Sequence, residues 1–483
     1  MNAVGIIEGP QALAPHWASI DWPRIRRQVS RLQARIVKAL RAGKWHRVRS
    51  LQRLLTNSLA AKLLAVQRVS SNRGSKTAGV DGVVLKTPAQ KWRQAHQLNA
   101  KEYAPKPLRR IYIPKKNGKR RPLGIPVQAD RAEQALELLA LDPVSETLAD
   151  ACSYGFRKER GAQDAIAGCF LALCRRRSAE WILEGDIRAC FDELSHPWLL
   201  AQVPTHQGKL RAWLKAGFME RGVFHPTTAG TPQGGILSPT AANMALDGLE
   251  TRLRARFKSH HKVNLVRYAD DFIITGVSQT LLADEVKPLV QQFLRERGLE
   301  LSEAKTHIVH IDEGFDFLGF NLRKYHGKLL IKPAKSSIAA VKENIRGIMN
   351  TNGHLSQDVL IYRLNPVIRG WGNYYRHVVS KEVFNDIDHA IWRMTWSWAT
   401  RRHPQKGRKW VKDRYYTHMD GRDWVFTDGS VTLFRMASIP IRRHVKIRGD
   451  ANPYDRQDAA YFTARHARQR GRLPTPAPPW FLP

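Results

Sequence analysis

Leu265–Gly276, with the sequence LVRYADDFIITG, places two adjacent carboxylates inside an apolar segment. Strand-forming residues lie on both sides of Asp270 and Asp271, so the pattern predicts β-structure with an acidic pair at its centre. Like charges side by side in an apolar setting repel one another and resist ionisation. A divalent cation resolves this conflict, and Mg²⁺ binds through one or two carboxylates together with substrate phosphates. The alternative is a hairpin turn, in which Asp is common.

A second apolar run, EWILEGDI at 180–187, ends near a third carboxylate, that of Asp186. If the two runs are neighbouring strands, the three acids converge on one site for two metal ions. Such a pair of ions activates an attacking oxygen and stabilises the leaving one in phosphoryl transfer. The alternative for Asp186 is a turn or cap residue.

The composition narrows the class of partner. The chain has 483 residues, and its 79 Lys and Arg against 42 Asp and Glu give a formal charge of +37. Such a field attracts polyanions, which disfavours an ordinary metabolic enzyme and favours nucleic acid. A hydrophobic content of 43% with 14 Trp excludes a disordered basic tail.

The cysteine pattern and the N-terminal sequence favour a cytoplasmic location. The four Cys at 152, 169, 174 and 190 have no CxxC spacing, so we expect reduced thiols, with neither a zinc module nor disulfides. The N-terminus lacks a basic segment before its apolar stretch, and no run of about 18 apolar residues is present.

The order of patterns predicts a basic helical front, a mixed α+β middle and a helical basic back. Helices are expected at 24–42 and 45–69, a loop at 70–82, and further helices at 130–148, 160–178, 208–222, 239–258 and 279–297. Short strands are expected at 315–322 and 329–331, with helices from about Lys335. The segment RIYIPKKNGKRRPLGIP at 110–126 predicts a hairpin, because Asn-Gly lies between two β-prone stretches. Its basic tip is suited to gripping phosphates, although a solubilising face is the alternative.

Seven ordered motifs over roughly residues 20–460 resemble the reverse transcriptases encoded by group II introns. They are the hairpin segment, SYGFR at 153–157, Gly185-Asp186 with Phe191, TPQGG at 231–235, YADD at 268–271, GLELSEAKT at 298–306 and FDFLGF at 315–320. IRGWGNYYRH at 368–377 looks like the thumb or maturase region.

The resemblance implies an α+β right-hand polymerase, with fingers, a palm built on an antiparallel sheet, and a mostly helical thumb or maturase domain. We expect a basic helical extension with the start of the fingers at 1–100, fingers and palm at 101–330, the thumb or maturase domain at 331–450, and a basic, Pro-rich tail at 451–483.

The resemblance also assigns the catalytic centre. Asp186, Asp270 and Asp271 are implied as catalytic residues and, with Ile187, as the metal-binding group for two Mg²⁺ ions, for which Mn²⁺ is a substitute. Phe191 is implied as the aromatic ring that excludes a 2′-hydroxyl.

The nucleotide-binding residues follow in the same way. Gln233 would contact the incoming nucleotide, Lys115 and Arg121 its triphosphate, Arg157 the template or nucleotide pocket, and Lys305 the leaving pyrophosphate. The bland alternatives are a core aromatic for Phe191, a turn residue for Gln233, a surface charge for Arg157 and a helix-end cation for Lys305.

Nucleic-acid contacts are expected from the fingers tip and the thumb. The residues are Lys119, Arg120, Arg369, Trp371, Tyr375 and Arg376, because aromatic rings beside cations suit stacking on bases and contact with phosphates. For most of the rings, packing in a helical core is the favoured alternative.

The expected activity is RNA-directed DNA polymerisation, in which dNTPs are added to a DNA primer 3′-OH on an RNA template, with a maturase role on structured intron RNA. One alternative is a splicing maturase with secondary polymerase activity, and another is a host-adapted repair polymerase that also copies DNA. An RNA polymerase is disfavoured by Phe191. Since no CxxC pair follows Asp455, we expect no HNH endonuclease.

Overall fold

The computed structural model describes residues 14–114, 118, 120–232 and 234–470. Its chain forms two compact units. The first comprises the residues up to Gly161, Leu183–Ile308 and Ile447–His466, and the second Ala162–Ile182, Val309–Lys446 and the residues from Ala467 onward. No helix among the described residues is long and apolar enough to cross a membrane.

The first unit begins with helices that pack on one long buried helix. They are α1 (Ala14–Ala18), α2 (Trp22–Arg41), α3 (Trp45–Asn57), α4 (Leu59–Ser71), α5 (Pro88–Gln97) and α6 (Gln128–Leu148). Apolar residues such as Ile36, Leu55, Val66 and Leu136 form one fully buried core between them. Apolar residues recur every three or four positions on α2, which is why one face is buried and the other carries arginines.

The basic hairpin is present as predicted. Strands β1 (Leu108–Pro114) and β2 (Arg120–Ile125) pair antiparallel, from Arg109 opposite Ile125 to Pro114 opposite Arg120. With β4 (Phe218–Glu220) and β5 (Val223–His225) they form a sheet in the order β2-β1-β4-β5. Lys115, Lys119 and most of the tip lie outside the described residues.

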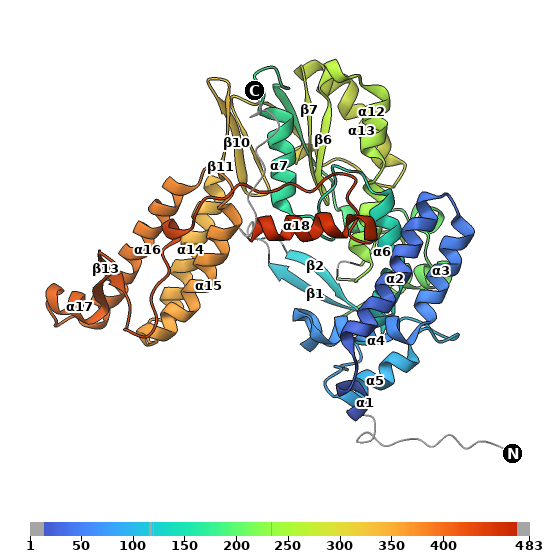
Figure 1. Ribbon diagram of the computed structural model, residues 1–483, viewed down its shortest axis with the longest axis horizontal. Helices are drawn as coiled ribbons and strands as arrows, with labels where there is room; N and C mark the ends of the chain where they lie inside the picture. Colours follow the sequence, from blue (N-terminus) through green and yellow to red (C-terminus); the bar gives the residue numbers. More distant parts are fainter. Residues whose placement is uncertain (1–13, 115–117, 119, 233, 471–483) are drawn as a thin grey trace. The chain divides into compact units, whose positions relative to one another are not determined.

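A second four-stranded sheet holds the acidic motifs. Its order is β6-β7-β3-β8, built from β3 (Trp181–Asp186), β6 (Asn264–Tyr268), β7 (Asp271–Gly276) and β8 (His307–His310). Helices α12 (Leu249–Arg256) and α13 (Lys287–Arg295) lie beside β6 and β7 in Figure 1. The unit also contains α8 (Cys190–Glu193), α9 (His196–Gln202), α10 (Gln207–Leu214), α11 (Ser238–Leu246), the π-helix η3 (Leu281–Val286) and the 3-10 helix η4 (Glu303–Lys305).

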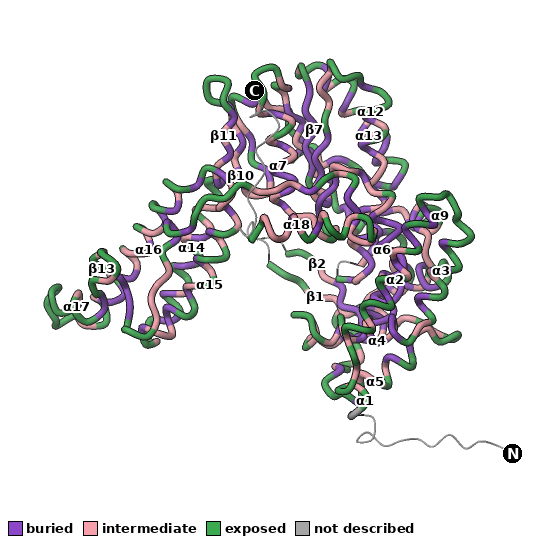
Figure 2. Tube along the Cα trace, in the orientation of Figure 1, coloured by how far each residue is buried: buried purple, intermediate pink, exposed green. Residues whose placement is uncertain are grey.

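The second unit has a small sheet followed by helices. It contains α7 (Ala162–Leu173) and a sheet of order β11-β10-β9, built from β9 (Phe315–Phe317), β10 (Phe320–Tyr325) and β11 (Lys328–Pro333). The helices that follow are α14 (Lys335–Thr351), α15 (Gln357–Tyr375), α16 (Lys381–Arg402) and α17 (Arg408–Tyr415). A hairpin of β12 (Tyr416–Met419) and β13 (Arg422–Phe426) comes after them. Helices α14, α15 and α16 lie together, and Figure 2 shows their inward faces buried. The last helix, α18 (Ala459–Gln469), belongs mostly to the first unit, which includes Ile447–His466.

The fold class is the predicted α+β one, but several predicted helix bounds are wrong. The segment 45–69 is two helices, because the chain is extended at Ser58, whose hydroxyl caps α4 at Ala61 N. The segment 239–258 is also two helices, since Gly248 adopts a left-handed conformation with φ of 94°. The segment 208–222 ends its helix at Leu214 and continues as β4.

Candidate active site

The acidic pair of YADD lies at a two-residue turn between β6 and β7. Tyr268 pairs with Asp271 across the hairpin, which leaves Ala269 and Asp270 as the turn. Ala269 has φ of 60°, an unusual conformation for a residue other than Gly or Asn. Asp270 is half-buried and Asp271, at the first position of β7, is exposed. The YADD motif therefore forms a hairpin turn, and this turn places two carboxylates at one end of the sheet.

The turn is fixed from two sides by residues of other motifs. A Cβ at Gly155, in SYGFR, would lie 2.4 Å from the backbone nitrogen of Ala269, so only glycine permits this close approach. From the other side, the fully buried Arg267 donates to the Ala269 carbonyl at 3.3 Å and to Asn243 Oδ1 at 3.1 Å. The position of the two carboxylates is thus set by packed backbone and a buried guanidinium.

Asp186 ends the strand beside β7. At Gly185 a Cβ would lie 2.2 Å from the Phe272 ring, so this glycine allows the ring to cover the strand. The Asp186 backbone carbonyl accepts from Ser302 N at 2.8 Å, and Ile187 bridges Leu301, which ties GLELSEAKT to the end of β3. Lys305 then donates from Nζ to Asp186 Oδ2 at 2.8 Å.

The three carboxylates lie close enough together to interact electrostatically. Desolvation and then the charges of Asp270 and Asp186 together raise the pKa of Asp271 to about 6, against the opposing effect of Lys305. The pKa of Asp270 is also raised, chiefly by desolvation and then by Asp186. Both shifts express one fact, that negative charge is crowded at this end of the sheet without a sufficient counter-charge.

The donor set fits a hard divalent cation. Carboxylate oxygens are the ligands that Mg²⁺ prefers, and the raised pKa values show a local need for positive charge. The ammonium of Lys305, paired with Asp186, already neutralises part of the negative charge of the three carboxylates. Within the described part of the chain, no three His, Cys, Asp or Glu side chains are gathered closely enough to form a ready metal site. The three carboxylates therefore affect one another electrostatically, but they do not lie as close together as the ligands of one metal ion would.

Phe191 lies on α8, immediately after Cys190, and is half-buried. Its ring meets Phe156 of SYGFR edge to face, with 6.2 Å between centroids. Burial raises the pKa of the Cys190 thiol to about 12, and Asp270 and Asp186 contribute to the shift, which places this helix beside the carboxylates. The ring thus belongs to the surroundings of the acidic group.

The TPQGG loop is attached to the same helix. Thr231 N donates to the Phe191 carbonyl at 2.6 Å, and Gly230 N donates to that of Leu194 at 2.8 Å. Gln233 itself lies outside the described residues, and its role stays a prediction.

The basic hairpin contributes one described cation to the site. Arg121, exposed on β2, lowers the pKa of Asp270 through its charge, so it lies within electrostatic reach of that carboxylate. Arg120 is exposed at the start of the same strand. The structure therefore brings Arg121 and Lys305 to the three Asp.

Arg157 has a different environment from the one expected. Its guanidinium is buried and donates to Glu146 Oε2 at 2.8 Å, Glu146 Oε1 at 2.9 Å, Asp150 O at 2.6 Å and Ser153 O at 2.7 Å. With these four bonds the side chain is committed to the protein interior, whereas a nucleotide contact needs free donors facing a pocket. The alternative of a surface charge does not describe it either, because only 5% of its side chain is exposed.

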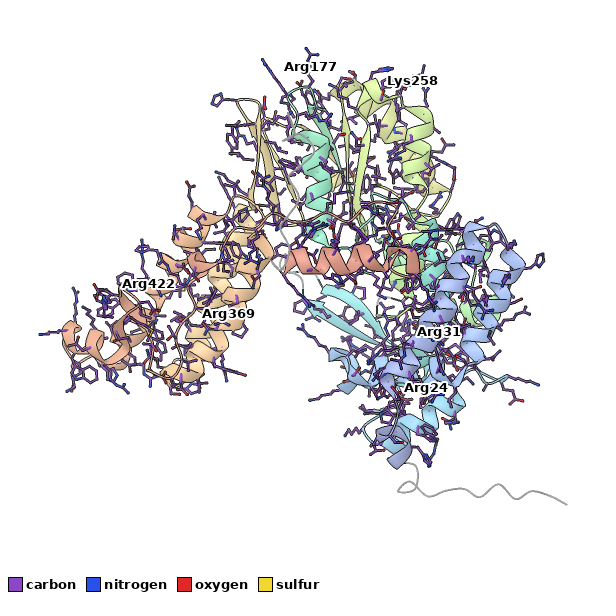
Figure 3. The ribbon with its side chains drawn as sticks, in the orientation of Figure 1. Arg24, Arg31, Arg177, Lys258, Arg369 and Arg422 are labelled. Atoms are coloured by element: carbon purple, nitrogen blue, oxygen red, sulfur yellow. The ribbon has the colours of Figure 1, made fainter. Side chains whose placement is uncertain are left out.

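The aromatic residues expected to contact nucleic acid are packed in the second unit. Tyr375 is buried and donates to Gly319 O at 3.0 Å, and the Trp371 ring packs against it at a tilt of 43°, with 4.3 Å between ring centroids. Arg376 is half-buried, and desolvation lowers its pKa. Arg369 is exposed, with its guanidinium 4.6 Å from the Phe434 ring centroid, and is labelled in Figure 3. Among the four, Arg369 is the residue placed to meet a ligand.

Three positioning residues were not found from the sequence. They are Arg267, which holds the YADD turn, and Glu146 with Arg160, which share the Arg157 cluster. The signal for Arg267 was a charged residue within an apolar strand. Glu146 and Arg160 carried no such signal, because each lies in an ordinary polar stretch.

Comparison with known families gives three consecutive matches. Residues 17–98 match the N-terminal domain of reverse transcriptase, 113–322 the reverse transcriptase (RNA-dependent DNA polymerase), and 338–416 the group II intron maturase-specific domain. Protein YkfC of Escherichia coli K12 is 33% identical over 336 residues, 59% of this chain and 86% of that protein.

Two other comparisons are weaker. The group II intron-encoded protein LtrA of Lactococcus lactis is 29% identical over 330 residues, and the chain spans about half the length of that relative, 54%. Apo telomerase from Candida tropicalis aligns with 65% of this chain and 66% of its own, at 12% identity and a TM-score of 0.39. So low a TM-score supports no inference about this chain.

Proposed function

The chain belongs to the reverse transcriptase family, with a reverse transcriptase domain followed by a group II intron maturase domain, and from this premise we propose that it adds dNTPs to a primer 3′-OH on an RNA template. The observation that supports this most is the convergence of Asp186, Asp270 and Asp271 in one electrostatic group at the end of the β6-β7-β3 strands.

In this proposal Asp186, Asp270 and Asp271 are the catalytic carboxylates and, with Ile187, hold the metal. The family generally uses a divalent metal. When bound, two Mg²⁺ ions, or Mn²⁺ in their place, would supply activation of the primer hydroxyl and charge stabilisation of the leaving pyrophosphate. The fixed turn at Ala269 keeps the two YADD carboxylates in place, so little reorganisation accompanies nucleotide binding.

The cations beside the three carboxylates bind different parts of the nucleotide. Arg121 of the hairpin, with Lys115 and Gln233 expected nearby, binds the incoming triphosphate. Lys305 leaves Asp186 for the pyrophosphate oxygens, to which an ammonium donates well. The Phe191 ring, supported by Phe156, lies against the sugar and leaves no room for a 2′-hydroxyl. Arg157 acts by holding SYGFR against the turn, and not by touching nucleotide.

The second unit extends the proposal to the RNA partner. The match to a group II intron maturase-specific domain at 338–416 favours structured intron RNA as a further ligand, with Arg369 among its contacts. We keep the predicted segments as the working division: fingers and palm at 101–330 and thumb at 331–450. The splicing maturase with secondary polymerase activity is the second candidate function, favoured by the same match.

Primer extension with dNTPs or rNTPs on RNA and DNA templates tests the polymerase. The full chain should incorporate dNTPs on RNA in the presence of Mg²⁺. The double variant Asp270→Asn with Asp271→Asn should lose extension by at least about a thousandfold while binding primer–template as before. As a matched control, Asp284→Asn on η3 removes an acidic charge outside the turn and should leave extension unchanged.

Two results would contradict this proposal. Absence of Mg²⁺-dependent incorporation on either template would overturn the polymerase. Extension by the double variant at the rate of the parent chain would overturn the assignment of the carboxylates.

A further inference from the structure

The second unit contains an aromatic cavity that the family matches only partly cover. The cavity has a volume of about 440 Å³ and is formed by α16, the β12–β13 hairpin and the segment after it. The maturase-specific match ends at residue 416, before most of the hairpin. The lining is mainly aromatic and charged, and it includes Trp392, Tyr416, Trp424 and Phe434, the cations Arg422 and Arg435, and the carboxylates Asp388 and Asp423.

Trp424 reaches this cavity through an irregular strand. Between the pairs Thr417–Val425 and Met419–Arg422, the single residue His418 of β12 faces two residues of β13, Asp423 and Trp424. Such a bulge redirects a side chain, and its left-handed position normally carries glycine. Here that position carries Trp424, with φ of 62°, which costs conformational energy for a bulky residue. The Trp424 side chain therefore occupies a position at which glycine would cause less backbone strain.

Packing alone does not account for this indole. Trp424 meets Trp392, Trp396 and Tyr416 edge to face, with 5.7, 5.2 and 5.5 Å between centroids, but 37% of its surface remains exposed. Lys412 Nζ lies 5.0 Å from its ring centroid, a cation–π arrangement on a surface face. An exposed ring beside a second ring gives a planar ligand one face for stacking and one edge for contact.

The charge around the cavity selects the class of planar ligand. Arg422 and Arg435 line it, and Figure 3 labels Arg422 in this unit. Arg435 Nε is 3.8 Å from Asp388 Oδ2, and its side chain is half exposed, so it retains donors for an anion. Aromatic rings with arginines at their margin are the arrangement that binds an unpaired base together with its phosphate.

We propose that this cavity binds one unpaired base of single-stranded RNA, stacked on Trp424, with its phosphate on Arg422 and Arg435. Asp423, on the bulge, has its Oδ1 2.8 Å from His418 Nδ1, and its largely exposed carboxylate offers a further acceptor to a ribose 2′-hydroxyl, a group that DNA lacks. This site rests on the proposed function in one respect, that the chain binds RNA, and it is independent of the carboxylates of the first unit.

The test uses the full chain and a single-stranded RNA in which one adenine is replaced by a fluorescent analogue. Stacking should quench the analogue. Trp424→Gly should abolish quenching and weaken binding about tenfold, while its melting temperature falls little, because glycine relieves the strained backbone. Arg422→Gln should weaken binding and flatten its salt dependence. Tyr362→Ala, which removes a 76% exposed ring of the same unit outside the cavity, should change neither.

Each contrary result points to a different error. Unchanged quenching in Trp424→Gly overturns the site. Equal affinity for single-stranded DNA of the same sequence overturns the assignment to RNA. The three variants should all extend a preannealed primer as the parent does, whereas the Asp270→Asn, Asp271→Asn variant should still quench the analogue. Failure of the site is thereby separated from failure of the polymerase.

Discussion

At the residue scale, the pKa of the partly exposed Asp271 is raised to about 6, because partial desolvation of its carboxyl and two neighbouring carboxylates oppose its ionisation. A carboxyl whose pKa is raised on folding stabilises the fold below its unfolded pKa, and that stability is lost as pH rises through the folded value. Without divalent metal, the free energy of unfolding should therefore decrease between about pH 4 and pH 6 on this account.

Asp271→Asn removes that unfavourable charge. In chelator at pH 7 the variant should be more stable than the parent by at most about 1 kcal/mol, since solvent screens an exposed group. Denaturant titration at pH 7 and below pH 4 measures this, and the difference should vanish at the acidic end. A variant less stable than the parent at pH 7 would show that the Asp271 carboxylate is stabilised by partners and not crowded by like charges.

Phe191 gives the second prediction at this scale. Phe191→Ala removes a half-buried ring that contacts Phe156, and the space beside the sugar should then accept a 2′-hydroxyl. The ratio of kcat/KM for dNTP over rNTP should fall by about tenfold or more. Phe156→Ala serves as the control, because it removes the supporting ring and should lower the ratio less. Unchanged discrimination in Phe191→Ala would return this ring to a packing role.

At the element scale, the sequence predicted the two hairpins that carry the basic and acidic motifs, but it missed β4, β5 and the β12–β13 hairpin as well as several helix ends. Asn117-Gly118 and the YADD turn carry local turn chemistry, so both hairpins follow from nearby residues. The break at Ser58 lies inside a continuous apolar period, and periodicity alone therefore predicted one helix where there are two.

The same limit applies to the candidate site. The three Asp were identified because their local patterns are unusual. The environment of Arg157 depends on Glu146, on a different element, and no local pattern encodes that pairing. A long-range ion pair between ordinary polar residues is visible only once the chain is folded.

The Arg157 cluster yields a prediction about the segment Ile447–His466. Arg160 binds Glu146 at 3.1 Å and also donates to the carbonyls of Gly449 and Ala451, at 3.3 and 3.2 Å. This segment is thus joined through Arg160 and Glu146 to Arg157, which holds SYGFR against the YADD turn. Disturbing the cluster should misplace the carboxylates without removing a nucleotide contact.

Arg160→Gln should therefore lower kcat about tenfold and leave KM for dNTP nearly unchanged, whereas loss of a nucleotide contact would raise KM. Arg160→Lys, which keeps the charge, should recover part of kcat. Single-turnover extension measures the two constants. A rise in KM in Arg160→Gln or Arg157→Gln, with kcat intact, would restore the original expectation that Arg157 faces the nucleotide pocket.

At the scale of the whole molecule, the charge of +37 is not evenly available to a ligand. Arg157, Arg160 and Arg267 are buried against carboxylates, and arginines of α12 are paired, such as Arg252 with Glu296. By contrast, Arg24, Arg31 and Lys38 lie exposed on α2 and have no ion pair among the residues the structure describes. Figure 3 labels Arg24 and Arg31 on that helix. The unpaired cations are those able to release counterions from a nucleic acid.

Affinity for RNA should accordingly fall steeply with salt, with log K decreasing by about 0.7 per phosphate contacted for each decade of salt. Replacing Arg24, Arg31 and Lys38 together by Gln should reduce that slope by about 2, because three contacts are lost. The matched triple replacement of Arg252, Arg254 and Arg256, each paired with a carboxylate, removes the same formal charge and should leave the slope nearly unchanged. Equal effects of the two triple variants would mean that binding follows net charge alone, and that the basic face of α2 has no specific part in holding RNA.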